Sequence, residues 1–413
     1  MSYTYDIQTS QKDNRSTISL SVCHLMYSII NLFLSTFLIA HIYSLTTDLY
    51  SYALNVGIYQ LSCYGCMLVS YFLFSFLVDK SNRIWVYRIA NIIEAVLVIV
   101  TIFYGKDLAK IVVLAGLLNG LAHGAYYASY NVLKQEMVSR KSLDNFAVVL
   151  MILTKIVSVV CPILLGALIE ISTFSMVAIY VLVLSVIQTV VSFFIKAKRP
   201  SESSFNLKQY FKRLKQNIKL NKKVKTIYIM SIFYGITSVV SALLNINIMI
   251  HFGSSFSLGT ITSVFALLTI AILILMKRFT KFGKRSWIFI VASLLQIITT
   301  IIFVCIPNVI TLIIYNLGYA ICDVIVATIF DIIRNKNLKE GGFYQDIAEH
   351  QCIIESIFQI TRCLSFTTLI VVSLFKNYII FQVLFVIFMI LYSITPLMLM
   401  KYENNEKKEE DEK

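Results

Sequence analysis

The feature that most constrains this chain is a series of about a dozen long apolar runs spread over its 413 residues. A helix that spans a membrane needs about 20 consecutive, mostly apolar residues, and these runs have that length. They do not alternate in segments of about ten residues, as the strands of a membrane β-barrel do. Charged residues make up only 14% of the chain, against roughly 25% in soluble domains. The sequence therefore predicts an all-α membrane protein.

We expect twelve transmembrane helices, divided six and six by a polar stretch at 197–225. The division predicts an N-terminal bundle over 18–196 and a C-terminal bundle over 226–400. A polar tail, 1–17, precedes them, and a charged tail of low complexity, 401–413, is predicted to be disordered. The predicted spans are 18–45, 52–78, 84–104, 108–133, 143–170, 174–196, 226–250, 256–276, 286–305, 308–333, 347–374 and 377–400.

Lys and Arg between the spans predict the orientation, because cytoplasmic loops carry an excess of these residues. One side holds a large basic set, including eleven Lys and Arg residues from Lys196 to Lys225. The opposite side holds only Lys106, Lys110 and Lys376. Both termini share the basic side, so we expect cytoplasmic termini and a multi-pass protein of the cell (plasma) membrane. The net charge of +14 then reflects the inner leaflet, and no basic soluble domain for nucleic-acid binding is evident.

The central basic stretch has a pattern of its own. Lysines alternate with apolar residues that recur at roughly helical spacing. These apolar residues are Phe205, Leu207, Phe211, Leu214 and Ile218. The pattern is typical of a basic amphipathic helix that lies on the inner membrane surface. A disordered linker is the alternative.

Short matches between the two predicted bundles indicate an internal repeat. The segment LTKIVSV at 153–159 matches ITRCLSF at 360–366, which pairs Lys155 with Arg362. The segment YNVLK at 130–134 matches FDIIR at 330–334, and the same offset pairs His123 with Asp323. The loop DKSNRI at 79–84 matches TKFGKR at 280–285. Three ordered matches at nearly one offset predict two pseudo-symmetric six-helix halves.

With these halves, the chain resembles the major facilitator superfamily over almost its whole length. That superfamily has a G-x-x-x-D-R/K-x-G-R/K-R/K pattern between its second and third helices. Here Asp79, Lys80 and Arg83 fit, whereas Ser75 and Asn82 replace the glycines and Ile84 replaces the last basic residue. The resemblance implies a cytoplasmic gate that latches the halves together. Its second copy is predicted at Lys281, Lys284 and Arg285, with Thr280 in the acidic position. Ordinary positive charge in cytoplasmic loops is the alternative.

Two other patterns of the superfamily are degraded. Antiporters carry a Gly- and Pro-rich pattern late in the fifth helix, of which only Pro162 and Gly166 are present, so export is weakly favoured. Many proton-coupled members carry an Arg in the fourth helix, and the corresponding stretch GLLNGLAHGAYYASYN has none. If protons drive transport, other residues must carry them.

Polar residues follow one face of the first, fourth, seventh and tenth predicted helices. Polar stripes inside a bilayer must face protein or a water-filled cavity, and in the resembled superfamily these four helices line the central cavity. Hydrogen bonding between packed helices is the alternative. The stripes include Asn31 and Ser35; Asn119, His123 and Tyr127; Tyr234, Ser238, Ser241 and Asn245; and Asn316, Tyr319 and Asp323. Beside the second stripe, a ridge of Gly116, Gly120, Gly124 and Ala128 predicts close helix packing.

Ionisable residues near mid-membrane are candidates for function, because each costs a few kcal/mol unless it is paired. These residues are Glu94, Lys155, Asp323, Glu355 and Arg362. In one interpretation, Lys155 and Arg362 bind the solute and Asp323 is a counter-ion or proton carrier, with His123 as a second carrier. In the other, Lys155–Glu94 and Arg362–Asp323 are structural ion pairs.

We therefore predict a secondary transporter that works by alternating access and exports or exchanges a small charged or amphipathic organic solute. No G-x-x-x-x-G-K-S/T loop is present, so an ion or solute gradient must supply the energy. Neither an enzyme activity, a cofactor nor a metal is predicted, and Cys63 and Cys66 are interpreted as core residues. The expected partners are membrane lipids, the solute and protons, and a monomer is expected. The alternatives are a non-transporting sensor or accessory subunit on a transporter fold, and a lipid flippase.

Overall fold

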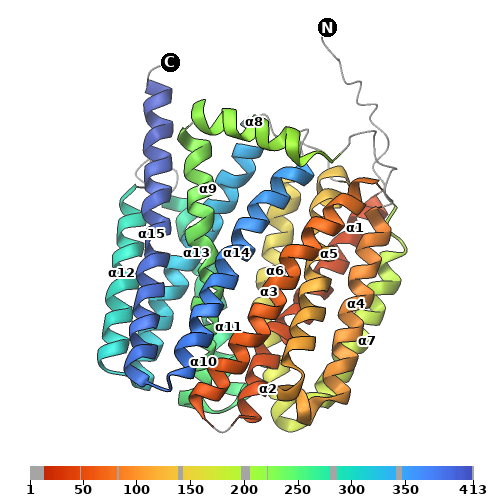
Figure 1. Cartoon of the computed structure of the whole chain (residues 1–413), viewed down its shortest axis with the longest axis vertical. Helices are drawn as coiled ribbons and strands as arrows, with labels where there is room; N and C mark the ends of the chain where they lie inside the picture. Colours follow the sequence, from red (N-terminus) through yellow and green to blue (C-terminus); the bar gives the residue numbers. More distant parts are fainter. Residues whose placement is uncertain are drawn as a thin grey trace.

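The computed structural model is a bundle of helices that run roughly in one direction (Figure 1). It describes residues 14–46, 48–80, 83–137, 143–196, 205–220, 222–279, 286–340 and 347–411. Within those ranges no strand occurs. The prediction of an all-α protein is thus confirmed.

The helix boundaries follow the apolar runs closely, because each run forms one membrane-length helix or two consecutive shorter ones. The helices are α1 (Asn14–Leu32), η1 (Phe33–Phe37), α2 (Leu38–Ser44), α3 (Leu49–Lys80), α4 (Arg83–Phe103), η2 (Gly105–Lys110), α5 (Val112–Met137), α6 (Leu143–Ile171), α7 (Phe174–Ser192), α8 (Leu207–Leu220), α9 (Lys222–Gly235), α10 (Thr237–Phe252), α11 (Ser255–Phe279), α12 (Ser286–Cys305), α13 (Val309–Glu340), α14 (Ile347–Leu374) and α15 (Tyr378–Asp411).

Eleven segments in the described part of the chain are long and apolar enough to span a membrane. Helix α5 occupies the position of the remaining predicted span, 108–133. It is not among the eleven because its glycines and polar residues, such as Asn119 and His123, make it less apolar than the others. The structure therefore supports a multi-pass membrane protein.

Two helix pairs make the most extensive contacts between the earlier and later parts of the chain. Helix α3 packs along α14, and α6 packs along α11. Among the earlier helices, α5 packs against both α3 and α4, and α4 packs against α7; among the later ones, α12 packs against α13 and α15. In Figure 1 the helices coloured red to yellow accordingly gather on one side of the bundle, and those coloured green to blue gather on the other.

The glycine ridge of α5 faces α3 at very short range. A Cβ atom added at Gly116 would overlap the backbone of Tyr59, and one added at Gly120 would overlap the backbone of Cys63. A Cβ atom at Gly124 would overlap the Ser70 hydroxyl. The predicted structural role of the ridge is confirmed, since only hydrogen atoms fit between the two helices.

The central basic stretch forms the predicted helix, α8, which crosses the end of the bundle from which α15 projects (Figure 1). Its apolar face lies on protein: Tyr210 and Leu214 are buried, and only Phe211 of the predicted apolar set is well exposed. The Tyr210 hydroxyl lies 2.7 Å from the Tyr228 hydroxyl and 2.8 Å from Nδ1 of His350. These contacts hold α8 on α9 and α14. Residues 207–220 are therefore a docked helix and not the disordered linker that was the alternative.

Two adjacent aromatic residues of α8 test this docking. Tyr210→Ala is expected to lower the free energy of unfolding by roughly 3 kcal/mol, because it removes a fully buried ring. Phe211→Ala is expected to change it by less than about 0.5 kcal/mol, because that ring is about half exposed. Thermal and denaturant unfolding of the purified protein in detergent would measure both. Equal losses for the two variants would contradict the docked arrangement.

The charged C-terminal tail differs from its prediction. Residues 401–411 continue α15 without a break, instead of forming a disordered tail. Glu and Lys are good helix formers, and pairs of them three or four residues apart stabilise an exposed helix. A helix already nucleated by the packed span extends into such a sequence at little cost.

Candidate functional site

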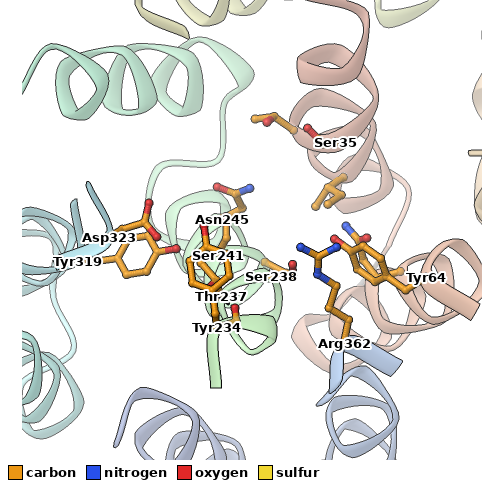
Figure 2. Close-up of a pocket in the computed structure, with 14 residues that line it drawn as sticks. Ser35, Tyr64, Tyr234, Thr237, Ser238, Ser241, Asn245, Tyr319, Asp323 and Arg362 are labelled. Carbon is orange, nitrogen blue, oxygen red and sulfur yellow. Dashed lines mark hydrogen bonds between the residues drawn. The ribbon is translucent and has the colours of Figure 1, made fainter. Parts of the chain in front are cut away.

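A polar cavity of about 320 Å³ lies between helices from the two sides of the bundle. Most lining side chains carry a hydroxyl, an amide or a charge, and Ile39 and Ala242 are the two exceptions. A polar cavity of this kind in an apolar bundle is a candidate solute site. The lining residues are Ser35, Thr36, Ile39, Gln60, Tyr64, Tyr234, Thr237, Ser238, Ser241, Ala242, Asn245, Tyr319, Asp323 and Arg362 (Figure 2).

Two of the lining helices are irregular where they reach the cavity. Ser35 and Thr36 lie in η1, a π-helical turn between α1 and α2. On the other side, α9 ends at Gly235 and α10 begins at Thr237. Gly235 allows this segment to approach α14, since a Cβ atom there would lie 2.8 Å from Cβ of Thr361. π-Helical turns are rare and occur frequently at functional sites.

Asp323, from the middle of α13, supplies the acidic group of the cavity. The Tyr392 hydroxyl donates a hydrogen bond of 3.0 Å to Oδ1 of Asp323. Tyr319, one turn earlier on α13, also lines the cavity. Lys155 of α6 attracts Asp323 electrostatically across the bundle, although it forms no ion pair with it within the described ranges. The charge of the carboxylate is therefore partly compensated by a residue that does not line the cavity.

Arg362, from the middle of α14, supplies the basic group. Its guanidinium carbon lies 4.9 Å from the centre of the Tyr64 ring and 5.7 Å from that of Phe358. Its Nη1 donates a hydrogen bond of 3.3 Å to Oε1 of Gln359. In Figure 2, Arg362 and Asp323 lie at opposite sides of the group, with Ser238 between them.

The structure brings together several residues of the predicted stripes. Asp323 and Arg362 both line the cavity, with Ser35 of the first stripe and the hydroxyl and amide residues of α9 and α10. Lys155 is half-buried on α6 and does not line the cavity, but it lies within electrostatic reach of Asp323. Asn31 is half-buried in α1 and also lies outside the lining.

The predicted stripe of α5 lies elsewhere. Asn119 donates a hydrogen bond of 2.8 Å to the Tyr59 hydroxyl, and His123 is hydrogen-bonded to the Tyr27 hydroxyl. Tyr127 packs edge-on against Tyr27 and Tyr126. None of these three α5 residues lines the cavity. Their polar atoms are satisfied by tyrosines of α1 and α3, which corresponds to hydrogen bonding between packed helices.

The two structural ion pairs considered from the sequence are not formed between the described side chains. Glu94 is buried, its Oε2 has no hydrogen-bond partner there, and no ion pair joins it to Lys155. Arg362 likewise forms no ion pair with Asp323, although both line one cavity. Glu355 instead lies 3.7 Å from Nη1 of Arg334. The attraction of Asp323 is to Lys155, which comes from the other side of the bundle.

The contribution of α3 to the cavity was not predicted from the sequence. Gln60 and Tyr64 lie four residues apart, on one face of α3, and both line the cavity. Tyr64 stacks on Arg362, so it positions the guanidinium. Their spacing of one helical turn was a usable signal, although a weak one in a helix that carries several other tyrosines.

Most of the predicted cytoplasmic gate lies outside the described part of the chain. This is the case for Lys281, Lys284 and Arg285, and for the side chains of Asp79 and Lys80. Arg83 is described and is buried at the start of α4. The gate therefore stays a prediction.

A family model described as Major Facilitator Superfamily matches residues 17–336. The uncharacterized protein YqgE of Bacillus subtilis (strain 168) is 26% identical over 211 residues, which are 50% of this chain and 48% of that protein. The chain thus matches about half the length of this curated relative.

Solved transporter structures resemble the whole chain. A POT family transporter in complex with 5-aminolevulinic acid has a TM-score of 0.68 at 12% identity, covering 95% of this chain and 96% of that one. A D-xylose-proton symporter has a TM-score of 0.67 at 9% identity, with coverages of 93% and 97%. The nucleoside transporter NupG has a TM-score of 0.61 at 14% identity, with coverages of 95% and 99%. At such low identities, these similarities concern the fold alone.

Proposed function

The chain belongs to the Major Facilitator Superfamily, and from this premise we propose that it moves a small charged organic solute across the cell membrane by alternating access. Family and fold point to a transporter and not to an enzyme. The observation that carries the proposal is the polar cavity between η1, α2, α3, α9, α10, α13 and α14, which contains one acid and one base among its lining residues. Secondary transporters bind their substrates at such mid-membrane sites.

The proposed architecture has twelve spans, with α5 as the twelfth, in two pseudo-symmetric halves over 18–196 and 226–400 and with cytoplasmic termini. The halves would rock along the α3–α14 and α6–α11 contacts. The sequence repeat supports this arrangement, because its basic pair, Lys155 and Arg362, lies close to one cavity from both sides. A lipid flippase fits less well, since Ile39 and Ala242 are the only wholly apolar side chains among the lining residues.

Coupling to protons and the direction of transport extend this proposal. Asp323 is the best-placed proton carrier, because it is the acidic residue of the lining and has a partly compensated charge. Pro162 and Gly166, which weakly favoured export, lie where α6 meets α11: a Cβ atom at Gly166 would lie 2.7 Å from the Ser255 carbonyl oxygen. Pro162 and Gly166 therefore also have a packing role at the α6–α11 contact, along which the two halves would move in the proposed mechanism.

Labelling of Ser238→Cys tests alternating access without knowledge of the solute. Ser238 lines the cavity, so its thiol should react with a membrane-impermeant maleimide added from either side of reconstituted vesicles. The parent chain, with its native cysteines, is the matched control for background labelling. Labelling from one side only, under all ion gradients, would contradict a transporter and favour a non-transporting sensor.

Solute movement provides the second test. Liposomes with an imposed pH gradient are screened with small charged solutes, and proton flux is followed with an internal pH dye. We expect saturable, solute-dependent flux that Asp323→Asn abolishes. If no solute moves, and Lys155→Ala and Asp323→Asn leave cellular function intact, the transport proposal fails.

A further inference from the structure

We propose that the transported solute is a small zwitterion, whose anionic group binds Arg362 and whose ammonium group binds Asp323. The inference rests on the proposed transport function and specifies the solute class of the same cavity. Three observations carry it. Arg362 has no ion-pair partner among the described residues, Oδ2 of Asp323 has no hydrogen-bond partner there, and the lining is polar with one charge of each sign.

Arg362 is a cation without a paired anion among the described residues. No carboxylate lies within ion-pair distance of it in the described part of the protein, and its Nε has no hydrogen-bond partner there. The nearest acid on its own helix, Glu355, is already paired with Arg334 at 3.7 Å. Tyr64 covers a face of the guanidinium, which leaves its edge for a ligand. A guanidinium edge binds a carboxylate through two parallel hydrogen bonds.

Asp323 is the complementary group. Tyr392 donates to its Oδ1, and its Oδ2 has no hydrogen-bond partner in the residues that the structure describes. Lys155, which does not line the cavity, attracts the carboxylate from beyond ion-pair distance. An ammonium group that enters the cavity would therefore compete with Lys155 for Asp323. The rings of Tyr234 and Tyr319 also line this part of the site and suit a bound cation.

The charge balance of the cavity favours a solute that carries both charges. A solute with one charge would leave either Arg362 or Asp323 without an ionic partner in the lining. A zwitterion pairs both. Between the two charges, Thr237, Ser238 and Ser241 offer hydroxyl groups to a polar backbone. The volume of about 320 Å³ is near the lower end of ligand sites, about 300–1,000 Å³, and suits a molecule of amino-acid size.

Binding to purified full-length protein in detergent tests the assignment. The probes are the ω-amino acids from glycine to 6-aminohexanoate, each compared with the carboxylate that lacks its amino group and the amine that lacks its carboxyl group. We expect one chain length to bind at least tenfold more tightly than both of its singly charged analogues, measured by calorimetry. Arg362→Gln should remove the advantage over the amine, and Asp323→Asn the advantage over the carboxylate.

Lys155→Met is expected to increase the affinity for the zwitterion, which the loss of a purely structural residue would not do. Without Lys155, the ammonium group no longer has a competitor for Asp323, so the zwitterion should bind several-fold more tightly while the carboxylate analogue is unaffected or weakened. Thermal unfolding of each variant without ligand shows whether it is folded. If a stably folded Lys155→Met protein binds the zwitterion more weakly, Lys155 does not compete with the ammonium group for Asp323, and the proposed position of that group is wrong.

The outcomes separate this inference from the transport proposal. Equal or tighter binding of a singly charged or neutral analogue, or no binding of any probe to the folded protein, overturns the zwitterion. If Ser238→Cys is still labelled from both sides, the transporter stands with another solute class. One-sided labelling defeats transport even where a zwitterion binds.

Discussion

Arg362→Ala is expected to reduce the rate of solute transport by at least about 30-fold, since loss of one partner from a buried charge pair costs roughly 2–5 kcal/mol. The guanidinium is the basic group of the cavity lining, and no other lining residue replaces its charge. Arg362→Lys should recover only part of the rate, because an ammonium group lacks the planar fork. Initial rates of solute uptake into proteoliposomes, normalised to reconstituted protein, measure the effect.

Arg88 provides the matched control for that substitution. It also lies in a membrane-length helix, but it lies over the rings of Trp85, at 5.2 Å, and Phe193, at 4.2 Å, and not in the cavity. Arg88→Ala should leave transport within about twofold, because the contacts of this half-buried side chain, which include a hydrogen bond to the Ser192 carbonyl, lie away from the cavity. Equal transport losses in the two variants would show that Arg362 acts through stability alone.

Gly120→Leu is expected to prevent α3 and α5 from packing and to destabilise the folded protein by more than about 3 kcal/mol. A Cβ atom at Gly120 would overlap the Cys63 carbonyl group, which is backbone and cannot rotate away. Gly65→Leu is the control on the neighbouring helix, because a Cβ atom there meets nothing within 4 Å. The yield of monodisperse protein and its thermal unfolding in detergent distinguish the two variants. A well-folded Gly120→Leu protein would contradict the close packing.

Hydropathy predicted most of the fold because a bilayer leaves few choices to the backbone. The predicted span 286–305, for example, coincides with α12. Hydropathy was less informative where a helix itself contains many polar or charged residues. Helix α5 is lengthy but only moderately apolar, and α15 continues to Asp411 through residues that are charged yet good helix formers.

The site was predictable in part. Asp323 and Arg362 stood out because a charge within an apolar run needs a partner or water. The stripe of Asn119, His123 and Tyr127 had the same appearance, but tyrosines of neighbouring helices satisfy it. Periodicity identifies the face of a helix that avoids lipid, and only the packed structure shows whether a side chain or water meets that face.

The irregular turns at Phe33–Phe37 and Gly235–Thr237 have a mechanical consequence. A helix bends most easily where its regular hydrogen-bond ladder is interrupted, and both interruptions lie at the wall of the cavity. Two of the lining segments, α1–η1–α2 and α9–α10, thus have a joint at the cavity wall. A molecule that contacts Ser35 on one side and Ser238 on the other would restrict bending at both interruptions. The empty and the solute-bound protein would therefore differ in stiffness as well as in charge.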